Sequence, residues 1–224
     1  MKKWLSYGIL FLCIPVILLL GATVFAGKQY AFITLAVAVL ACIPFVLTFE
    51  NKRQSAAKLS VVAVMTALSV VGRFLFFAVP GFKPITAVVV ITAMYLGPQA
   101  GFMTGALTAV ISNFYFGQGA WTPFQMFTWG LIGFLGGILA SALKRSRILL
   151  CVFGVASGIV YALLMDIYTV LWQENGFHFA RYVAALTSGL PFMAVYACSN
   201  VIFLLVLAKP IGVQLQRIRD KYGL

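Results

Sequence analysis

Ionisable side chains that could do chemistry are few in this chain, and two of them stand inside apolar stretches. The sequence holds only four acidic residues and one histidine, so general acid–base catalysis has few candidate groups. Arg73 and Asp166 each interrupt an apolar stretch, where an ionised group within a bilayer needs a partner or water. Two interpretations stay open: a buried ion pair that fixes helix packing, or polar groups that line a ligand site.

Motifs for several enzyme classes are absent from the sequence. There is no G-x-x-x-x-G-K-[ST] loop, no H-E-x-x-H, no G-x-S-x-G and no paired acidic motif. The four cysteines lie far apart in apolar stretches, which predicts small buried residues rather than a metal site or a disulfide framework. We therefore expect no cofactor, no metal and no catalytic residue. Two rival functions stay open: a membrane enzyme acting on a lipid or isoprenoid around Arg73 and Asp166, and an assembly subunit without a ligand.

Aromatic and amide residues gather in segments that share one predicted side of the membrane. They are Phe76, Phe77, Phe82, residues 113–123, Gln125, Trp129, Tyr161, Tyr168, Trp172, His178 and Tyr196. Such loops, rich in glycine and aromatics and poor in charge, suit a pocket that stacks on a flat organic ligand. An interfacial aromatic belt is the alternative, but a belt would place Trp and Tyr on both faces.

The elements that position these residues are predicted to be membrane-spanning helices. The chain is 63% hydrophobic and 9% charged, against about 25% charged in a soluble domain. No charged residue and no histidine occurs from Ile85 to Leu143 or from Tyr182 to Ala208. Such blocks are longer than the roughly 20 residues with which a helix crosses a bilayer. A helix is expected because its backbone groups form hydrogen bonds with one another where no water is present. The sequence predicts an all-α integral membrane protein.

Charges and helix breakers divide the chain into eight predicted spans. They cover residues 5–25, 30–48, 59–79, 85–96, 100–116, 125–143, 148–172 and 184–208. A Gly-Pro pair at Gly97 and Pro98 predicts a tight turn after the short fourth span. An even number of spans places both termini on the same side of the membrane.

The distribution of basic residues predicts that both termini are cytoplasmic. With the N-terminus inside, the cytoplasmic segments hold twelve of the 16 basic residues: Lys2, Lys3, Lys52, Arg53, Lys58, Lys144, Arg145, Arg147, Lys209, Arg217, Arg219 and Lys221. The other four are Lys28, Arg73, Lys83 and Arg181. The net charge of +12 is thus a topology signal rather than a sign of nucleic-acid binding. Cleavage of a signal peptide near residues 24–26 is an alternative, but a retained first helix is favoured.

Small residues recur every fourth position on two predicted helices. Gly97, Gly101, Gly105 and Ala109 form one stripe, and Ala63 and Ala67 form another. Such stripes let helices approach closely in lipid. For the glycine stripe we expect packing within the chain.

Residues 72–127 carry a more specific pattern. They read G-R-F…F-K-P…G-P-x-x-G-F…S-N-F-x-F-G-Q-G-x-W-T-P-F-Q-M-F. This run resembles the substrate-binding S components of energy-coupling factor (ECF) vitamin transporters, some of them assigned to cobalamin. The resemblance implies a six-helix core over residues 58–210, preceded by an extra transmembrane hairpin and basic linker over 1–57 and followed by a basic cytoplasmic tail over 211–224. It also implies that Ala63 and Ala67 dock to a coupling subunit and that residues 81–84 belong to a loop covering the site.

The resemblance implies a function in vitamin uptake across a bacterial plasma membrane. The chain would capture a vitamin outside, with cobalamin as the first expectation and a queuosine precursor or another vitamin as alternatives. A membrane coupling subunit and two ATPase subunits would supply the energy, with membrane lipid as the surroundings. A pocket with so little charge must hold its ligand by stacking, amides and shape. The expected substrate-binding residues are Arg73, Phe82, Lys83, Asn113, Gln118, Trp121, Gln125, Trp129 and Asp166.

Overall fold

The computed structural model describes residues 2–24, 29–48, 52–174 and 177–224, and within these ranges the chain is helical with short connections and no strand. This confirms the predicted all-α class. The elements are α1 (Lys2–Gly8), the π-helical turn η1 (Ile9–Cys13), α2 (Ile14–Thr23), α3 (Tyr30–Val46), α4 (Lys52–Leu75), α5 (Ile85–Leu96), α6 (Pro98–Phe116), α7 (Trp121–Ile138), α8 (Ala140–Arg145), α9 (Arg147–Glu174) and α10 (Phe179–Tyr222). Part of the suggested cleavage segment, residues 25 and 26, lies outside the described residues.

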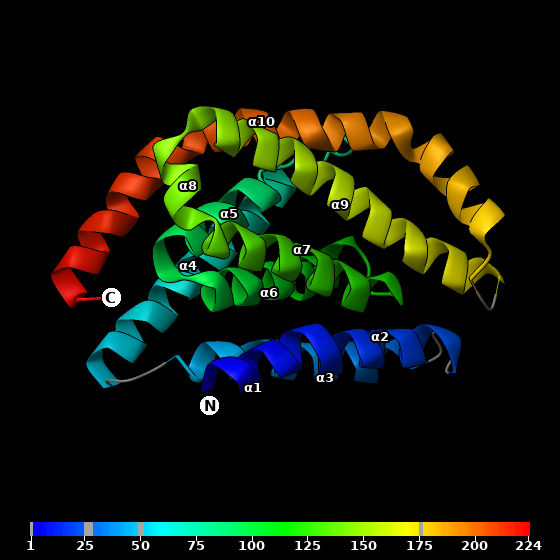
Figure 1. Cartoon of the computed structure of the whole chain (residues 1–224), viewed down its shortest axis with the longest axis horizontal. Helices are drawn as coiled ribbons and strands as arrows, with labels where there is room; N and C mark the ends of the chain where they lie inside the picture. Colours follow the sequence, from blue (N-terminus) through cyan, green and yellow to red (C-terminus); the bar gives the residue numbers. More distant parts are fainter. Residues whose placement is uncertain (1, 25–28, 49–51, 175–176) are drawn as a thin grey trace.

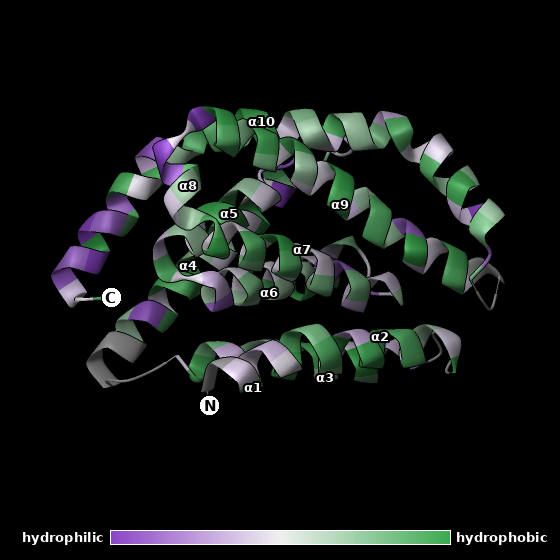
Figure 2. Cartoon of the chain, in the orientation of Figure 1, coloured by the Kyte–Doolittle hydropathy of each residue, from purple (hydrophilic) through white to green (hydrophobic). Residues whose placement is uncertain are grey.

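Four stretches are long and apolar enough to cross a membrane: Trp4–Thr23, Ala56–Leu75, Arg147–Trp172 and Phe179–Tyr222. Between 28% and 33% of their most apolar windows is buried inside the protein, so most of each helix surface faces outward. Figure 2 shows mostly hydrophobic residues along α9 and the middle of α10, as a helix in lipid requires. Each predicted span overlaps helical structure, but the first covers α1, η1 and α2, the sixth covers α7 and part of α8, and the third runs past the end of α4 at Leu75. The 12-residue α5 would extend about 18 Å, which is shorter than the hydrocarbon core.

The short helix α5 is the centre of the molecule. Eleven of its 12 residues are buried, because its sequence is apolar all round and it packs against α4, α6, α7, α8, α9 and α10. It ends at Gly97, whose φ of +99° suits glycine, and α6 begins at once with Pro98 in its first turn. The predicted Gly-Pro turn is therefore confirmed. The two ends of α5 open toward two different sites, which are described below.

Glycines bring α6 and α7 into backbone contact. A Cβ added to Gly105 would lie 2.5 Å from the main-chain carbon and oxygen of Trp129, and one added to Gly101 would lie 2.8 Å from the oxygen of Gly133. On the facing helix, a Cβ on Gly133 would lie 2.6 Å from the oxygen of Gly101. The glycine stripe thus packs within the chain, as predicted, and it fixes the register of Trp129 against α6.

The remaining helices cover this pair on two sides. Figure 1 shows α1, η1, α2 and α3 lying along one side of α6 and α7, and α9 and α10 lying together on the other side. The last helix continues beyond residue 208, where the predicted span ends, and the predicted tail is helical as far as Tyr222. The reason is packing, since Gly212 lies against the ring of Tyr95 and Leu215 is buried.

The close approach of α6 and α7 predicts the effect of a single methyl group. Gly105→Ala should lower the melting temperature of the detergent-purified protein, because the two backbones must separate, at a cost of about 1–3 kcal/mol. Gly8→Ala is the matched control, since nothing lies within 4 Å of a Cβ added there. Equal melting temperatures for the two variants would contradict the described packing.

Candidate functional site

A chain of hydrogen bonds joins four helices at one end of α5. Arg73, in the last turn of α4, donates from Nη1 to Ser112 Oγ and to Asn113 Oδ1, the latter at 2.7 Å. Asn113 Nδ2, on α6, donates to Gln125 Oε1 on α7 at 2.9 Å. Gln125 Nε2 donates in turn to Tyr161 Oη on α9 at 2.9 Å. Asn113 and Gln125 are both buried, and their bonds meet the requirement that buried polar groups find partners.

Aromatic rings surround the guanidinium of Arg73. Its central carbon lies 4.5 Å from the ring centroid of Phe116 and 5.5 Å from that of Trp129. Trp129 stacks on Tyr161 with centroids 5.6 Å apart, and Tyr161 packs on Tyr196 at 4.8 Å. Ring faces attract a cation, most strongly where water is excluded. The cluster therefore stabilises a buried positive charge and offers flat surfaces beside it.

These groups enclose a cavity of about 20 Å³. Its lining comprises Arg73, Lys83, Ile85, Thr86, Gln125, Trp129 and Tyr196. This volume accommodates about one water molecule, whereas pockets for organic ligands measure about 300–1,000 Å³. The described conformation is thus closed around the polar cluster.

The connection between α4 and α5, residues 76–84, closes one side of this cavity. The backbone N–H of Lys83 donates to Ser199 Oγ at 2.9 Å, and that hydroxyl donates to the Lys83 carbonyl at 3.1 Å. Phe76 and Phe82 both pack on Phe203 with centroids 5.0 Å apart, so two hydrogen bonds and two ring contacts fasten the connection to α10. Burial lowers the pKa of the Lys83 ammonium, and the nearby charge of Arg73 lowers that pKa further. Among the described residues that line the cavity, none is acidic, which makes this lining electropositive.

The structure brings five of the nine predicted site residues together. Arg73, Lys83, Gln125 and Trp129 line one cavity, and Asn113 is hydrogen-bonded to two of them. These residues come from three helices and one connection. Their grouping supports the predicted pocket but not the predicted ligand contacts, which stay a proposal.

The other four predicted residues lie outside this cavity. Phe82 faces α10, as described, and Gln118 donates to the Val110 carbonyl and lines a separate cavity beside α3. Trp121 is 40% exposed, with its ring against Gly119. Asp166 faces α10, with Oδ2 3.6 Å from the place of a Cβ on Gly189. Within the described part of the chain, Arg73 forms no ion pair with Asp166, so the sequence hypothesis of a buried pair does not apply here.

Several contributors to the site are not among the nine predicted substrate-binding residues, although Tyr161, Tyr196 and Thr122 belong to the aromatic and amide segments named from the sequence. Thr86 and Tyr196 line the cavity, Ser112 and Thr122 bond to its network, and Tyr161 accepts a hydrogen bond from Gln125. Tyr161 carried a usable signal, because a tyrosine in the middle of an apolar helix needs a partner for its hydroxyl. The serine and threonines carried none, since such residues commonly bond to their own helix backbone.

Comparison with protein families shows to which family the chain belongs. The chain matches the family model of the ECF-type riboflavin transporter, S component, over residues 53–217. The chain belongs to this family. No curated protein and no solved structure matches it.

The matched region of this S component includes every residue that lines the Arg73 cavity and leaves out α1, η1, α2 and α3. ECF S components are substrate-binding membrane subunits of vitamin-type transporters. They work with a membrane coupling subunit and ATPases. The prediction of an S component is therefore confirmed. In the ranges that the structure describes, no three His, Cys, Asp or Glu side chains gather as metal ligands.

The network predicts that one hydroxyl stabilises the closed S component. Tyr161→Phe should lower the melting temperature, because Gln125 Nε2 loses its acceptor and an unsatisfied buried donor costs about 1–3 kcal/mol. Tyr115→Phe is the matched control, since the Tyr115 side chain is 72% exposed. If both variants have the melting temperature of the wild type, the hydrogen bond between Gln125 and Tyr161 contributes nothing to stability.

Proposed function

We propose that this S component captures a flat heteroaromatic vitamin of the flavin type in the Arg73 cavity. The observation that carries the proposal is a guanidinium set beside stacked rings within one buried cavity. Carbonyl and ring-nitrogen acceptors of such a ligand would accept hydrogen bonds from Arg73 and Lys83. Its ring would stack on Trp129 or Tyr196. Riboflavin, which the family description names, has this chemistry.

Ligand entry requires the site to open from its closed state. The connection 76–84 is the segment expected to move, since it lies over the cavity and is held to α10 by two hydrogen bonds and two ring contacts. These few contacts are weak enough to exchange for contacts with a ligand. Phe82 and Lys83 would then meet the ligand as parts of this cover.

Cobalamin is the larger alternative. A corrin with its nucleotide side chain is several times the size of a flavin and would demand a much wider opening of the same helices. Nothing in the cavity lining requires a corrin, so we place a flavin-type vitamin first. Direct comparison of the two ligands distinguishes these proposals.

We further propose that α4 docks the coupling subunit. Ala63 and Ala67 are both exposed on one face of α4, together with Val64, Leu68 and Val71. A flat strip of small residues lets a partner helix approach closely in lipid. The coupling subunit would link the chain to two ATPases, which would hydrolyse the ATP, so the chain itself needs no catalytic residue.

The membrane orientation is part of the same proposal. Lys58, Lys144, Arg145 and Arg219 all line a cavity at the end of α5 that is opposite the Arg73 cavity. Figure 2 shows hydrophilic residues gathered at that end of the molecule, around α8 and the last turns of α10. The positive-inside rule supports a cytoplasmic position for this end, and with it we propose that both termini are inside and the vitamin site is outside in a bacterial plasma membrane. The core would comprise residues 58–210, with 1–57 as an additional hairpin and linker and 211–224 as a basic cytoplasmic end.

Ligand-dependent stability tests the substrate class. Riboflavin at a hundred times its dissociation constant should stabilise the detergent-purified protein by about 2.7 kcal/mol, and cobalamin at the same concentration should not. Arg73→Gln should weaken riboflavin binding at least tenfold, because a charge-assisted donor is lost. Arg147→Gln, an exposed arginine at the start of α9, is the matched control. Stabilisation by cobalamin instead would overturn the flavin proposal, and stabilisation by neither would remove the site.

Bulky substitutions test the docking face. The double variant Ala63→Leu/Ala67→Leu should abolish uptake in cells while leaving vitamin binding by the purified protein unchanged, because the added side chains hold the partner helix away. Ala156→Leu, on the exposed face of α9, controls for the addition of bulk to a lipid-facing helix. Wild-type uptake by the double variant would show that the coupling subunit docks elsewhere.

A further inference from the structure

A second and larger cavity lies at the other end of α5. Its volume is about 580 Å³, and Tyr95, Leu96 and Gly97 form part of its wall. Ile85 and Thr86, at the start of the same helix, line the Arg73 cavity. Ten residues of helix separate the two walls by about 15 Å. The two cavities share no residue, so this one stands independently of the vitamin site.

Four basic side chains from three helices face this cavity. Lys58 comes from α4, Lys144 and Arg145 from α8, and Arg219 from α10. Among the described residues that line the cavity, none has an Asp or Glu side chain. Partial burial lowers the pKa of Lys144, and the charge of Arg219 lowers that pKa further. Cations held together in this way favour an anion between them.

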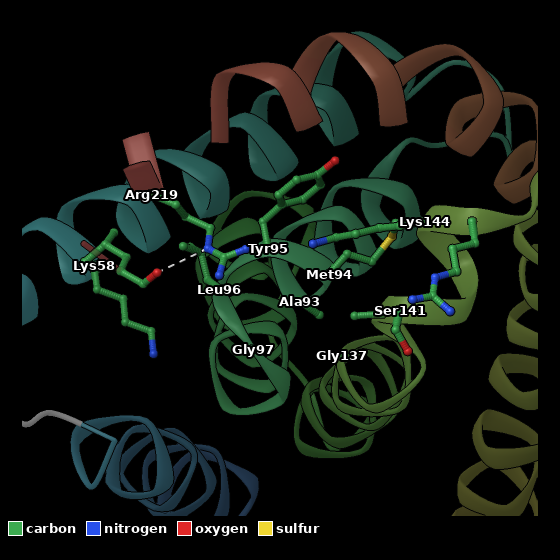
Figure 3. A pocket seen from close by; sticks show the side chains of 13 residues that line it. Lys58, Ala93, Met94, Tyr95, Leu96, Gly97, Gly137, Ser141, Lys144 and Arg219 are labelled. Carbon is green, nitrogen blue, oxygen red and sulfur yellow. Dashed lines mark hydrogen bonds between the residues drawn. The ribbon is translucent and has the colours of Figure 1, made fainter. Parts of the chain in front are cut away.

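Contacts with neighbouring residues hold Lys144 and Arg219 in position. Lys144 Nζ lies 4.0 Å from the ring centroid of Tyr95, and that ring is held against Gly212, where a Cβ would collide with its hydroxyl. Arg219 Nε donates to the main-chain oxygen of Leu224 at 3.3 Å, which leaves both terminal nitrogens of the guanidinium for another acceptor. Figure 3 shows Arg219 and Lys144 extending toward one another from opposite sides of the cavity.

One wall of the cavity is backbone rather than side chain. Gly97 and Gly137 both line it, and no described atom lies within 4 Å of a Cβ added to Gly97. This leaves open space above the turn between α5 and α6 for a group larger than a single ion. A tetrahedral group with several acceptor oxygens can meet an arginine fork and an ammonium at once, which a carboxylate matches less fully.

We propose that this cavity binds a phosphate group through Lys144 and Arg219, with Lys58 and Arg145 adding to the field. The cavity opens at the basic end of the molecule, where lipid headgroups and soluble phosphates both have access. The phosphodiester of an anionic phospholipid and a free phosphate share the chemistry that the site recognises. Either source would neutralise the four cations and hold the ends of α4, α8 and α10 together.

Thermal stability of the full-length protein in neutral detergent tests this proposal. One arm titrates short-chain phosphatidylglycerol against phosphatidylcholine of equal chain length, and a second titrates inorganic phosphate against chloride at equal ionic strength. Phosphatidylglycerol or phosphate should raise the melting temperature of the wild type. The double variant Lys144→Gln/Arg219→Gln should need at least a tenfold higher concentration of the same compound for an equal rise. Arg217→Gln is the matched control, since this exposed arginine lies two residues from Arg219 on α10 and does not line the cavity.

Each outcome either identifies what the cavity binds or shows that it is not a specific phosphate site. Stabilisation by phosphatidylglycerol alone identifies a lipid headgroup, and stabilisation by inorganic phosphate as well identifies a soluble phosphate site. Should the double variant fail to fold, Lys144→Gln alone carries the comparison, with at least a threefold weaker response expected. Equal responses from wild type, the Lys144 variant and Arg217→Gln would show only general attraction between a basic surface and anions, and would overturn the proposal.

Discussion

The Arg73 guanidinium is partly buried among helices, and no carboxylate of the described residues is paired with it, so neutral acceptors and ring faces must replace the water that it loses. Its partners come from α6, its ring neighbours from α6 and α7, and the bonds continue to α9. That arrangement exists only because glycines on α6 and α7 let the two backbones touch. Packing of small residues therefore determines where the charge can be held, and the charge determines what the site can bind.

The central helix α5 links this site to the opposite end of the molecule. It is buried on every side, and each of its ends contributes to a different electropositive cavity. The Arg73 cavity is nearly filled by its own side chains, whereas the basic cavity is open. A substrate-binding subunit gains from this difference, because a closed site keeps water from its buried charge until a ligand replaces the internal contacts.

Much of this architecture could be predicted from the sequence, because hydrophobic blocks and helix breakers are local signals. The boundaries of α5 and α6 followed from Gly97 and Pro98, and the stripe at Gly101 and Gly105 indicated close helix packing. Which side chains contact one another was harder to predict, because this depends on how each helix is rotated about its own axis. Asp166 interrupts an apolar stretch as Arg73 does, but it faces α10 at Gly189, and Trp121 lies against Gly119 rather than in the cavity. The last predicted span ended at residue 208, but packing of Gly212 and Leu215 carries α10 to Tyr222.

The central claim is that a flat vitamin stacks within the Arg73 cavity, and flavin fluorescence tests it most directly. Riboflavin emission should be quenched on titration with the detergent-purified protein, saturating at one ligand per chain, because the bound ring lies against Trp129 or Tyr196. Trp129→Phe should change the extent of quenching while the protein still binds. Unchanged emission at protein concentrations that saturate any tight site would contradict the account.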